Sequence, residues 1–193
     1  LIWQKMGVPE QPIKIVPWAR GYHQVQNKKH TVLFTMSRTE ERETLFKWVG
    51  PIFRARHVLI GLANAPIKLN SLEDAKQYTI GTIREDVGEI SLLQAGFDRG
   101  RLESVSSLEQ NIKKLLVGRV DFISQSEDSV RDFLQLKNYD RAQFKTVAVV
   151  NEMQNYYAFH KQTPDILIQE FQAVLNSLDT ERHEIMIRYN MSP

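Results

Sequence analysis

The stretch SRTEERE at residues 37–43, followed by FKWVGPI at 46–52, decides how the rest of this chain is interpreted. It is a charged, hydroxyl-rich turn that lies between the apolar run Val32–Phe34 and an aromatic segment containing Gly and Pro. A strand that ends in hydroxyl groups and is followed by arginine places hydrogen-bond donors where a small anion can bind. This turn is therefore the first candidate for a binding site.

The composition limits the classes of partner. The chain of 193 residues is long enough for one large domain or two small lobes. Its net charge of only +2 gives no electrostatic case for nucleic acid, so we expect no nucleic-acid partner. No apolar run approaches the roughly 18 residues of a membrane span, so we expect no direct membrane insertion.

The sequence contains no pattern that is typical of catalysis or metal binding. There is no cysteine, which excludes thiol catalysis, cysteine metal sites and disulfides. The five histidines do not show the H-x-x-x-H spacing of a metal site. There is also no Gly-rich phosphate loop and no G-x-S-x-G elbow. We therefore expect no enzyme activity, no cofactor and no metal.

The middle of the chain alternates between helix and strand patterns. Capping patterns begin at Ser71, Asp86 and Ser107, and Asp86 has Glu89 three residues later. We expect helices at 86–95, 107–117 and 128–136, and strands at 78–83, 101–105, 120–123 and 144–150. Such alternation with short loops predicts βαβ units around a parallel sheet.

The two ends of the chain are less regular. We expect weakly strand-like residues at 12–17, a short helix at 18–26, and strands at 31–36 and 56–61. Two helices are expected near the C-terminus. One begins around Thr163 with Pro164 at its first helical position, and the other covers 181–189.

Several short segments, in this order and spacing, resemble the bacterial family 3 solute-binding proteins, which are periplasmic receptors of polar amino-acid transporters. Besides the turn at 37–43, they are VPWAR at 16–20, IGTIREDVG at 80–88, GRVDFI at 118–123 and YYAFHK at 156–161. The resemblance covers nearly the whole chain. It implies an α/β, type II periplasmic-binding-protein fold of two lobes with mostly parallel sheets, and a solute bound between the lobes.

The resemblance also implies the domain limits. Lobe one would be 1–54 plus 154–193, lobe two 58–149, and the hinge crossovers 53–56 and 150–154. Family members begin with a strand, an aromatic-bearing loop and a Gly-rich turn into the first helix. This sequence starts near the end of that helix, so the three segments have no counterpart in it. We therefore expect the first lobe to be incomplete in this chain.

In the first lobe, the resemblance implies that Arg42 pairs with the ligand's carboxylate, because a guanidinium offers a planar fork that fits this group. Arg38 could compete for the role, but the spacing favours Arg42. Thr35 and Ser37 would bond the ligand, or else only stabilise the turn. Trp18 would stack on the ligand, or else pack in the core.

In the second lobe, Asp86 and Val87 stand where the family's helix N-terminus faces the ligand carboxylate. Glu85 and Asp86 bring negative charge where the family usually has Gly and Ser or Thr, and Arg84 could restore the balance. If Asp86 only caps its own helix, fewer donors remain for an anion.

The strongest departure from the family is at Ser126 and Glu127. Family members that bind amino acids usually place Asp or Glu at the position of Ser126 to hold the ligand's ammonium. A serine cannot neutralise a buried ammonium. Either Glu127 replaces the missing acid, or the ligand is not an ordinary α-amino acid.

The resemblance implies an extracytoplasmic receptor that captures a small polar solute and delivers it to the membrane permease of an ABC transporter. It would be periplasmic, with its signal peptide removed. Two alternatives use the same fold, namely a sensor domain of a signalling protein and the effector-binding part of a transcription regulator. A few members are dehydratases, which need a catalytic acid in the cleft.

Overall fold

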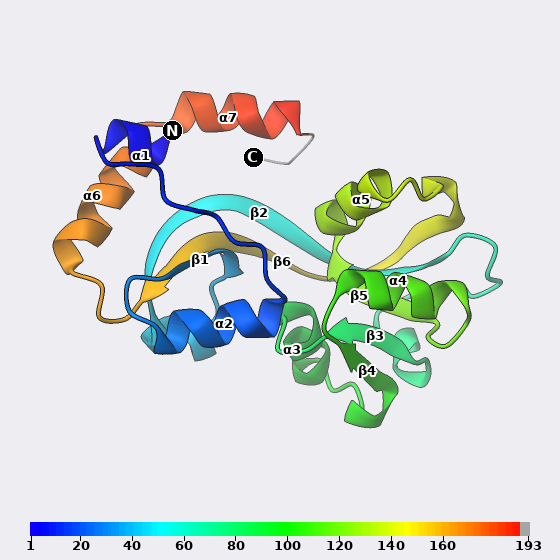
Figure 1. Ribbon diagram of the computed structural model, residues 1–193. Helices are drawn as coiled ribbons and strands as arrows, with labels where there is room; N and C mark the ends of the chain where they lie inside the picture. Colours follow the sequence, from blue (N-terminus) through cyan, green and yellow to red (C-terminus); the bar gives the residue numbers. More distant parts are fainter. Residues whose placement is uncertain (190–193) are drawn as a thin grey trace. The chain divides into compact units, whose positions relative to one another are not determined.

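The computed structural model describes residues 1–189, and the chain divides into two compact units. Unit 1 comprises residues 1–16, 20–54 and 154–193, and unit 2 comprises 17–19 and 55–153. Two long strands, β2 (Phe46–Leu62) and β6 (Phe144–His160), each contribute residues to both units (Figure 1).

Besides its parts of β2 and β6, unit 1 contains the helices and the strand formed by the two ends of the chain. They are α1 (Ile2–Lys5), α2 (Trp18–Asn27), β1 (Val32–Ser37), the 3₁₀ turn η1 (Glu40–Leu45), α6 (Asp165–Asn176) and α7 (Asp179–Arg188). The first two residues of α2 belong to unit 2.

Unit 2 holds the alternating elements of the middle of the chain. They are η2 (Glu73–Gln77), β3 (Ile80–Ile83), α3 (Val87–Gln94), η3 (Arg99–Arg101), β4 (Leu102–Val105), α4 (Leu108–Leu116), β5 (Phe122–Ser126), α5 (Glu127–Leu136) and η4 (Arg141–Gln143).

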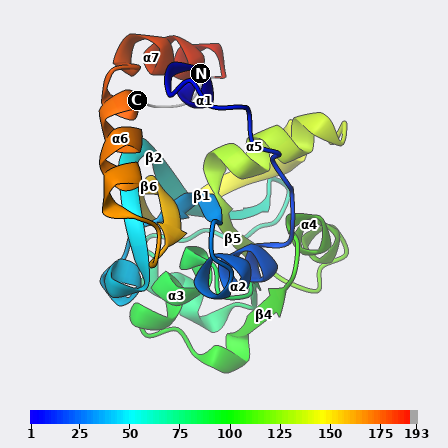
Figure 2. The same cartoon turned by 60° about the vertical axis from the view of Figure 1, so that its left-hand side comes forward.

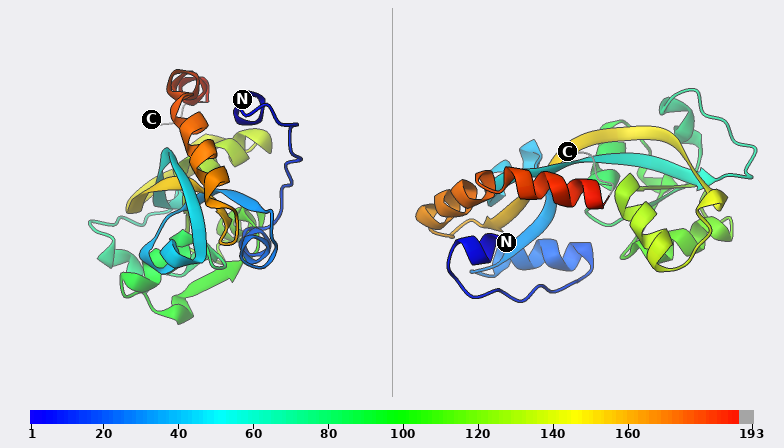
Figure 3. Two further views of the ribbon diagram at one scale, coloured as in Figure 1. Left: turned by 90° about the vertical axis from the view of Figure 1, so that its left-hand side faces the viewer. Right: turned by 90° about the horizontal axis from the view of Figure 1, so that it is seen from above.

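The expectation of mostly parallel sheets is wrong, because the strands follow the order β1-β6-β2-β5-β3-β4 with mixed directions. β3 runs parallel to β4 and β5, as βαβ units require, whereas β1 with β6 and β2 with β5 are antiparallel. The antiparallel pairs involve β2 and β6, which the sequence predicted only in part. Figure 3 shows both as long, curved strands.

The β-strands of unit 2 bury both faces, and each face has its own apolar cluster. Val58, Ile60 and Ile123 pack with side chains of α4 and α5, including Ile112 and Val130. The alternate residues Leu59 and Phe122 pack with Ile80, Leu92 and Leu102 on the other side. Because successive side chains of a strand point to opposite faces, this alternation places helices on both sides of the sheet.

Unit 1 has its core around Phe171 of α6. Its ring meets the rings of Trp3, Tyr157 and Phe159 edge-on at centroid distances of 5.5, 5.2 and 5.1 Å. α1 therefore lies against α6, as Figure 2 shows. α2 packs elsewhere, where Gly21 lies close to Leu33 of β1.

Two local expectations are also corrected. Residues 12–17 form no strand, and their side chains are largely exposed, which leaves nothing for a strand to pack against. Pro164 is the N-cap of α6 and precedes the first helical residue. β1 pairs with β6 and stands at the end of the strand order. That the first lobe is incomplete stays a prediction.

Candidate functional site

The turn at residues 37–43 begins at the end of β1 in unit 1. Ser37 is the last residue of that strand and lies opposite Asn155 of β6. The Ser37 hydroxyl donates a hydrogen bond of 2.9 Å to Asn155 Oδ1, and both residues are buried. This bond fixes the point from which the turn leaves the strand.

Arg42 is almost completely buried, with 2% of its surface exposed. The turn η1 folds its side chain back, so that Nη1 donates to the Ser37 carbonyl oxygen at 3.3 Å. The guanidinium carbon lies 5.1 Å from the ring centroid of Tyr22, which itself meets Phe46 edge-on. The Ser37 carbonyl and the Tyr22 ring thus hold the Arg42 guanidinium in one orientation.

Arg38 has a different environment from Arg42. Its Nε and Nη2 donate to the two Glu43 oxygens at 2.7 and 2.5 Å, and its guanidinium lies near the rings of Trp48 and Tyr156. Its hydrogen bond to Glu43 raises the pKa of Arg38 and lowers the pKa of Glu43. Its side chain is 39% exposed, so Arg38 forms a surface ion pair.

Thr35 is exposed in β1, where the register shifts between Leu33 and Met36. Unit 1 therefore brings Ser37 and Arg42 together, and the exposed Thr35 lies two residues before Ser37.

The candidates of unit 2 lie at the carboxyl ends of β3 and β5. These strands are parallel neighbours, with Ile80 opposite Phe122, so the segments that follow them emerge at the same edge. Asp86 and Val87 follow β3, whereas Ser126 ends β5 and Glu127 begins α5.

At the start of α3, acidic side chains accept from two backbone N–H groups. Asp86 is the N-cap, and its Oδ1 accepts from the Val87 N–H at 2.8 Å. Glu89 Oε2 accepts from the N–H of Glu85 at 2.9 Å. The Trp18 indole donates to the Glu85 carbonyl at 2.9 Å, which places Trp18 at this turn. Arg84 is exposed.

Ser126 and Glu127 both have structural partners. Ser126 is the N-cap of α5 and accepts from the Ser129 N–H. The two carboxylate oxygens of Glu127 accept separately, one from Arg56 Nη1 at 3.2 Å and the other from the Thr146 hydroxyl at 2.7 Å. If Glu127 were to bind an ammonium, it would have to give up these contacts.

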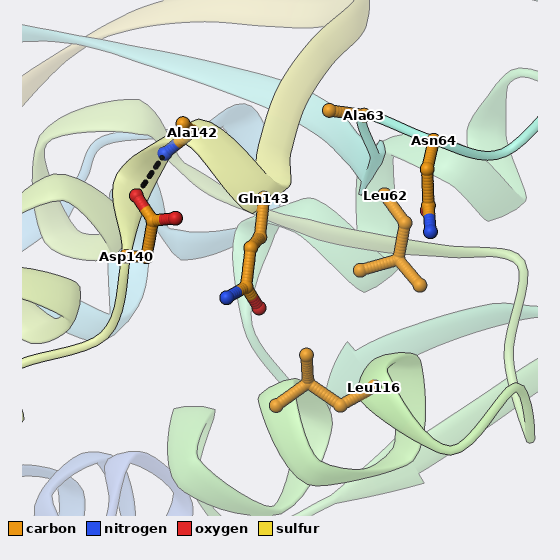
Figure 4. A pocket seen from close by; sticks show the side chains of 7 residues that line it. All are labelled: Leu62, Ala63, Asn64, Leu116, Asp140, Ala142 and Gln143. Carbon is orange, nitrogen blue, oxygen red and sulfur yellow. Dashed lines mark hydrogen bonds between the residues drawn. The ribbon is translucent and has the colours of Figure 1, made fainter.

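A surface pocket of about 370 Å³ lies elsewhere in unit 2 (Figure 4). It is lined by Leu62, Ala63, Asn64, Leu116, Asp140, Ala142 and Gln143. Because β2 runs antiparallel to β5, the end of β2 lies at the amino end of β5, at the opposite edge from Ser126. This pocket contains none of the candidates from the sequence.

Within residues 1–189, no group of His, Cys, Asp and Glu side chains is arranged to hold a metal ion. In the same part of the chain, no helix combines the length and the apolar character of a membrane span.

The sequence did not indicate the residues that position the candidates. Tyr22 and Asn155 gave no local signal, because their contacts with Arg42 and Ser37 join segments far apart in the chain. Glu89 had a signal, since it stands three residues after the N-cap Asp86. No signal in the sequence indicated that Glu89 is buried against β3 and β4.

No known family profile matches the chain, and no curated protein matches it in sequence. Solved structures do match. A mutant of ArgBP from T. maritima has a TM-score of 0.84 at 19% identity, over 97% of this chain and 80% of that chain. ArtJ from Geobacillus stearothermophilus, an arginine-, lysine- and histidine-binding protein, has a TM-score of 0.82 at 17% identity, over 100% of this chain and 83% of that chain.

A histidine kinase sensor domain with similarity to periplasmic binding proteins also matches, with a TM-score of 0.87 at 17% identity. It covers 100% of this chain and 84% of that chain. These likenesses show that the chain has a periplasmic-binding-protein fold. The similar structures named here are binding proteins and a sensor domain.

Proposed function

We propose that this protein is a periplasmic receptor that binds a small polar solute with a carboxylate group and delivers it to the permease of an ABC transporter. In this proposal, residues 1–54 plus 154–193 and residues 58–149 act as the two lobes, with hinge crossovers at 53–56 and 150–154. The protein is not an enzyme, and it works without a cofactor.

The single observation that carries the proposal is the environment of Arg42. It is a buried arginine at the end of a strand, fixed by the Ser37 carbonyl and the face of Tyr22. Arg38, in contrast, is exposed and forms a surface ion pair with Glu43. Burial raises the strength of an ion pair with a carboxylate, because water screens it less.

The fold supports the receptor role. One of the similar structures is the substrate-binding protein of an amino acid ABC transporter, with a TM-score of 0.83 at 18% identity. Fold alone does not fix function, so the solute class rests on the residues of the candidate site.

We infer that the solute is a carboxylate that does not depend on an α-ammonium group. Ser126 caps α5, and the oxygens of Glu127 are engaged by Arg56 and Thr146. An ammonium buried without an acid would lose several kcal/mol of hydration, of which a serine hydroxyl returns only about 1 kcal/mol.

A second candidate function is supported by the likeness to the histidine kinase sensor domain, which extends over 100% of this chain and 84% of that domain. In that case the same carboxylate site would report the solute to a signalling partner. A membrane span and a kinase or cyclase domain encoded in the same gene would favour this function over transport.

A thermal-shift and calorimetry panel tests the proposed solute class. It compares butanoate with butanamide, which has the same size but no charge, and with the standard amino acids. We expect butanoate-type carboxylates to bind and their amides not to bind. Tight binding of an ordinary amino acid together with no binding of butanoate would contradict the inferred independence from the ammonium group, and equal binding of acid and amide would contradict the carboxylate site.

A further inference from the structure

The carboxylate of Glu89 occupies the place at the start of α3 where an anion would otherwise bind. A helix N-terminus attracts anions through its unpaired N–H groups and its partial positive charge. In unit 2, Glu89 Oε2 takes the N–H of Glu85, and Asp86 Oδ1 takes the N–H of Val87. Two internal anions thus use donors that a ligand anion would need.

Glu89 is held firmly in this position. It is only 3% exposed, and its other oxygen, Oε1, accepts from the hydroxyls of Ser104 and Thr82. Arg99 Nη1 lies 3.7 Å from the same oxygen, with a side chain that is 64% exposed. The carboxylate is therefore part of a buried network that joins β3, β4 and α3.

The surroundings of the turn add acceptors and little positive charge. Glu85 and Asp86 precede the helix, while the cations Arg84 and Arg99 are largely exposed. Ser124 of β5 is 1% exposed, and its Oγ atom points toward Gly88 in the first turn of α3. This Oγ atom has no hydrogen-bond partner among residues 1–189. This hydroxyl offers a lone pair to the turn and no positive charge.

We propose that Glu89, together with Asp86, is a specificity-determining residue that makes this turn reject anions. The part of a solute that meets the turn is therefore uncharged or cationic. That a solute contacts this turn rests on the proposed function, whereas the rejection of anions is a property of unit 2 itself.

The test uses sulfate as a simple anion and follows the backbone amides of residues 85–88 by NMR. The wild-type protein, Glu89→Gln and Asp86→Ser are titrated with sodium sulfate, with sodium chloride at equal ionic strength as a reference. Asp86→Ser keeps an N-cap side chain and serves if Glu89→Gln does not fold. Glu73→Gln, which removes an exposed acid of the same unit, is the matched control.

We expect no saturable sulfate shift in the wild type or in Glu73→Gln. In Glu89→Gln or Asp86→Ser we expect saturable shifts at these amides, with sulfate affinity raised at least about tenfold. Saturable binding to the wild type at these amides overturns the proposal, and so does a lack of any response in the folded variants. A carboxylate panel without binding would instead overturn the proposed function and leave the sulfate result unchanged.

Discussion

Replacing Gly88 with alanine is expected to destabilise the protein only while Ser124 keeps its hydroxyl group. Gly88 lies in the first turn of α3, and a Cβ atom placed there would be 2.8 Å from Ser124 Oγ. Real Cβ atoms do not approach so closely, so either the hydroxyl or the helix must move. The contact joins β5 to the turn that carries Asp86 and Glu89.

The size of the effect follows from two opposing contributions. A helix gains about 1 kcal/mol when glycine is replaced by alanine, whereas overpacking a buried contact costs about 1–3 kcal/mol. Gly88→Ala should therefore lower the free energy of unfolding by about 1 kcal/mol. Ser124→Ala removes a buried hydroxyl that makes no hydrogen bond within residues 1–189, which should raise it by about 1 kcal/mol.

In the double variant the clash is absent and the helix gain remains. The free energy of unfolding should then exceed that of Ser124→Ala by about 1 kcal/mol, which corresponds to a coupling of about 2 kcal/mol. Urea unfolding of the four proteins, followed by tryptophan fluorescence and circular dichroism, measures this coupling. If Gly88→Ala has the same effect in both backgrounds, the close contact is not what limits this turn.

Two further predictions concern unit 1. Arg182 Nη2 donates to the carbonyls of Pro51 at 2.8 Å and Ile52 at 2.6 Å. Arg182→Ala should therefore lower the free energy of unfolding, measured in urea, by about 2–3 kcal/mol. An unchanged urea midpoint would contradict this expectation. Glu43 has a lowered pKa because Arg38 donates to it, so its stabilisation is present at neutral pH and is lost as pH falls below about 4.3 and through the folded-state pKa. The melting temperature of wild type should exceed that of Glu43→Gln slightly at pH 7, and the difference should shrink as pH falls below about 4.3, whereas a difference that does not change with pH would argue against the pair.

Local chemistry explains which parts of the fold could be predicted from the sequence. Asp86 and Ser107 are N-caps as expected, because capping depends on residues three positions apart. β2 extends far beyond the predicted residues 56–61. The earlier part of the strand was not predicted, because Gly50 and Pro51 are typical of a turn. Neighbouring strands on both sides stabilise a strand that local propensity does not favour.

The candidate site was predictable to a similar extent. Spacing favoured Arg42 over Arg38 as the carboxylate anchor, and this choice stays a prediction. In the structure Arg42 is buried, whereas Arg38 is exposed and pairs with Glu43. The burial of Glu89 could not be predicted, because it depends on Thr82 and Ser104 lying side by side on parallel strands. Register depends on the side-chain patterns of both strands and on the segments that connect them, so one segment read alone does not show which residues lie opposite each other.

Carboxylate binding by variants of Arg42 tests the central claim most directly. Calorimetry with the tightest-binding carboxylate should show that Arg42→Ala loses about 2–5 kcal/mol, a rise of roughly 30- to 4000-fold in Kd, because a buried charge loses its partner. Arg42→Lys should recover only part of this loss, and Arg20→Ala, which removes an exposed arginine of the same unit, should bind as the wild type does. Circular dichroism checks that each variant is folded, and wild-type affinity in a folded Arg42→Ala would contradict the account.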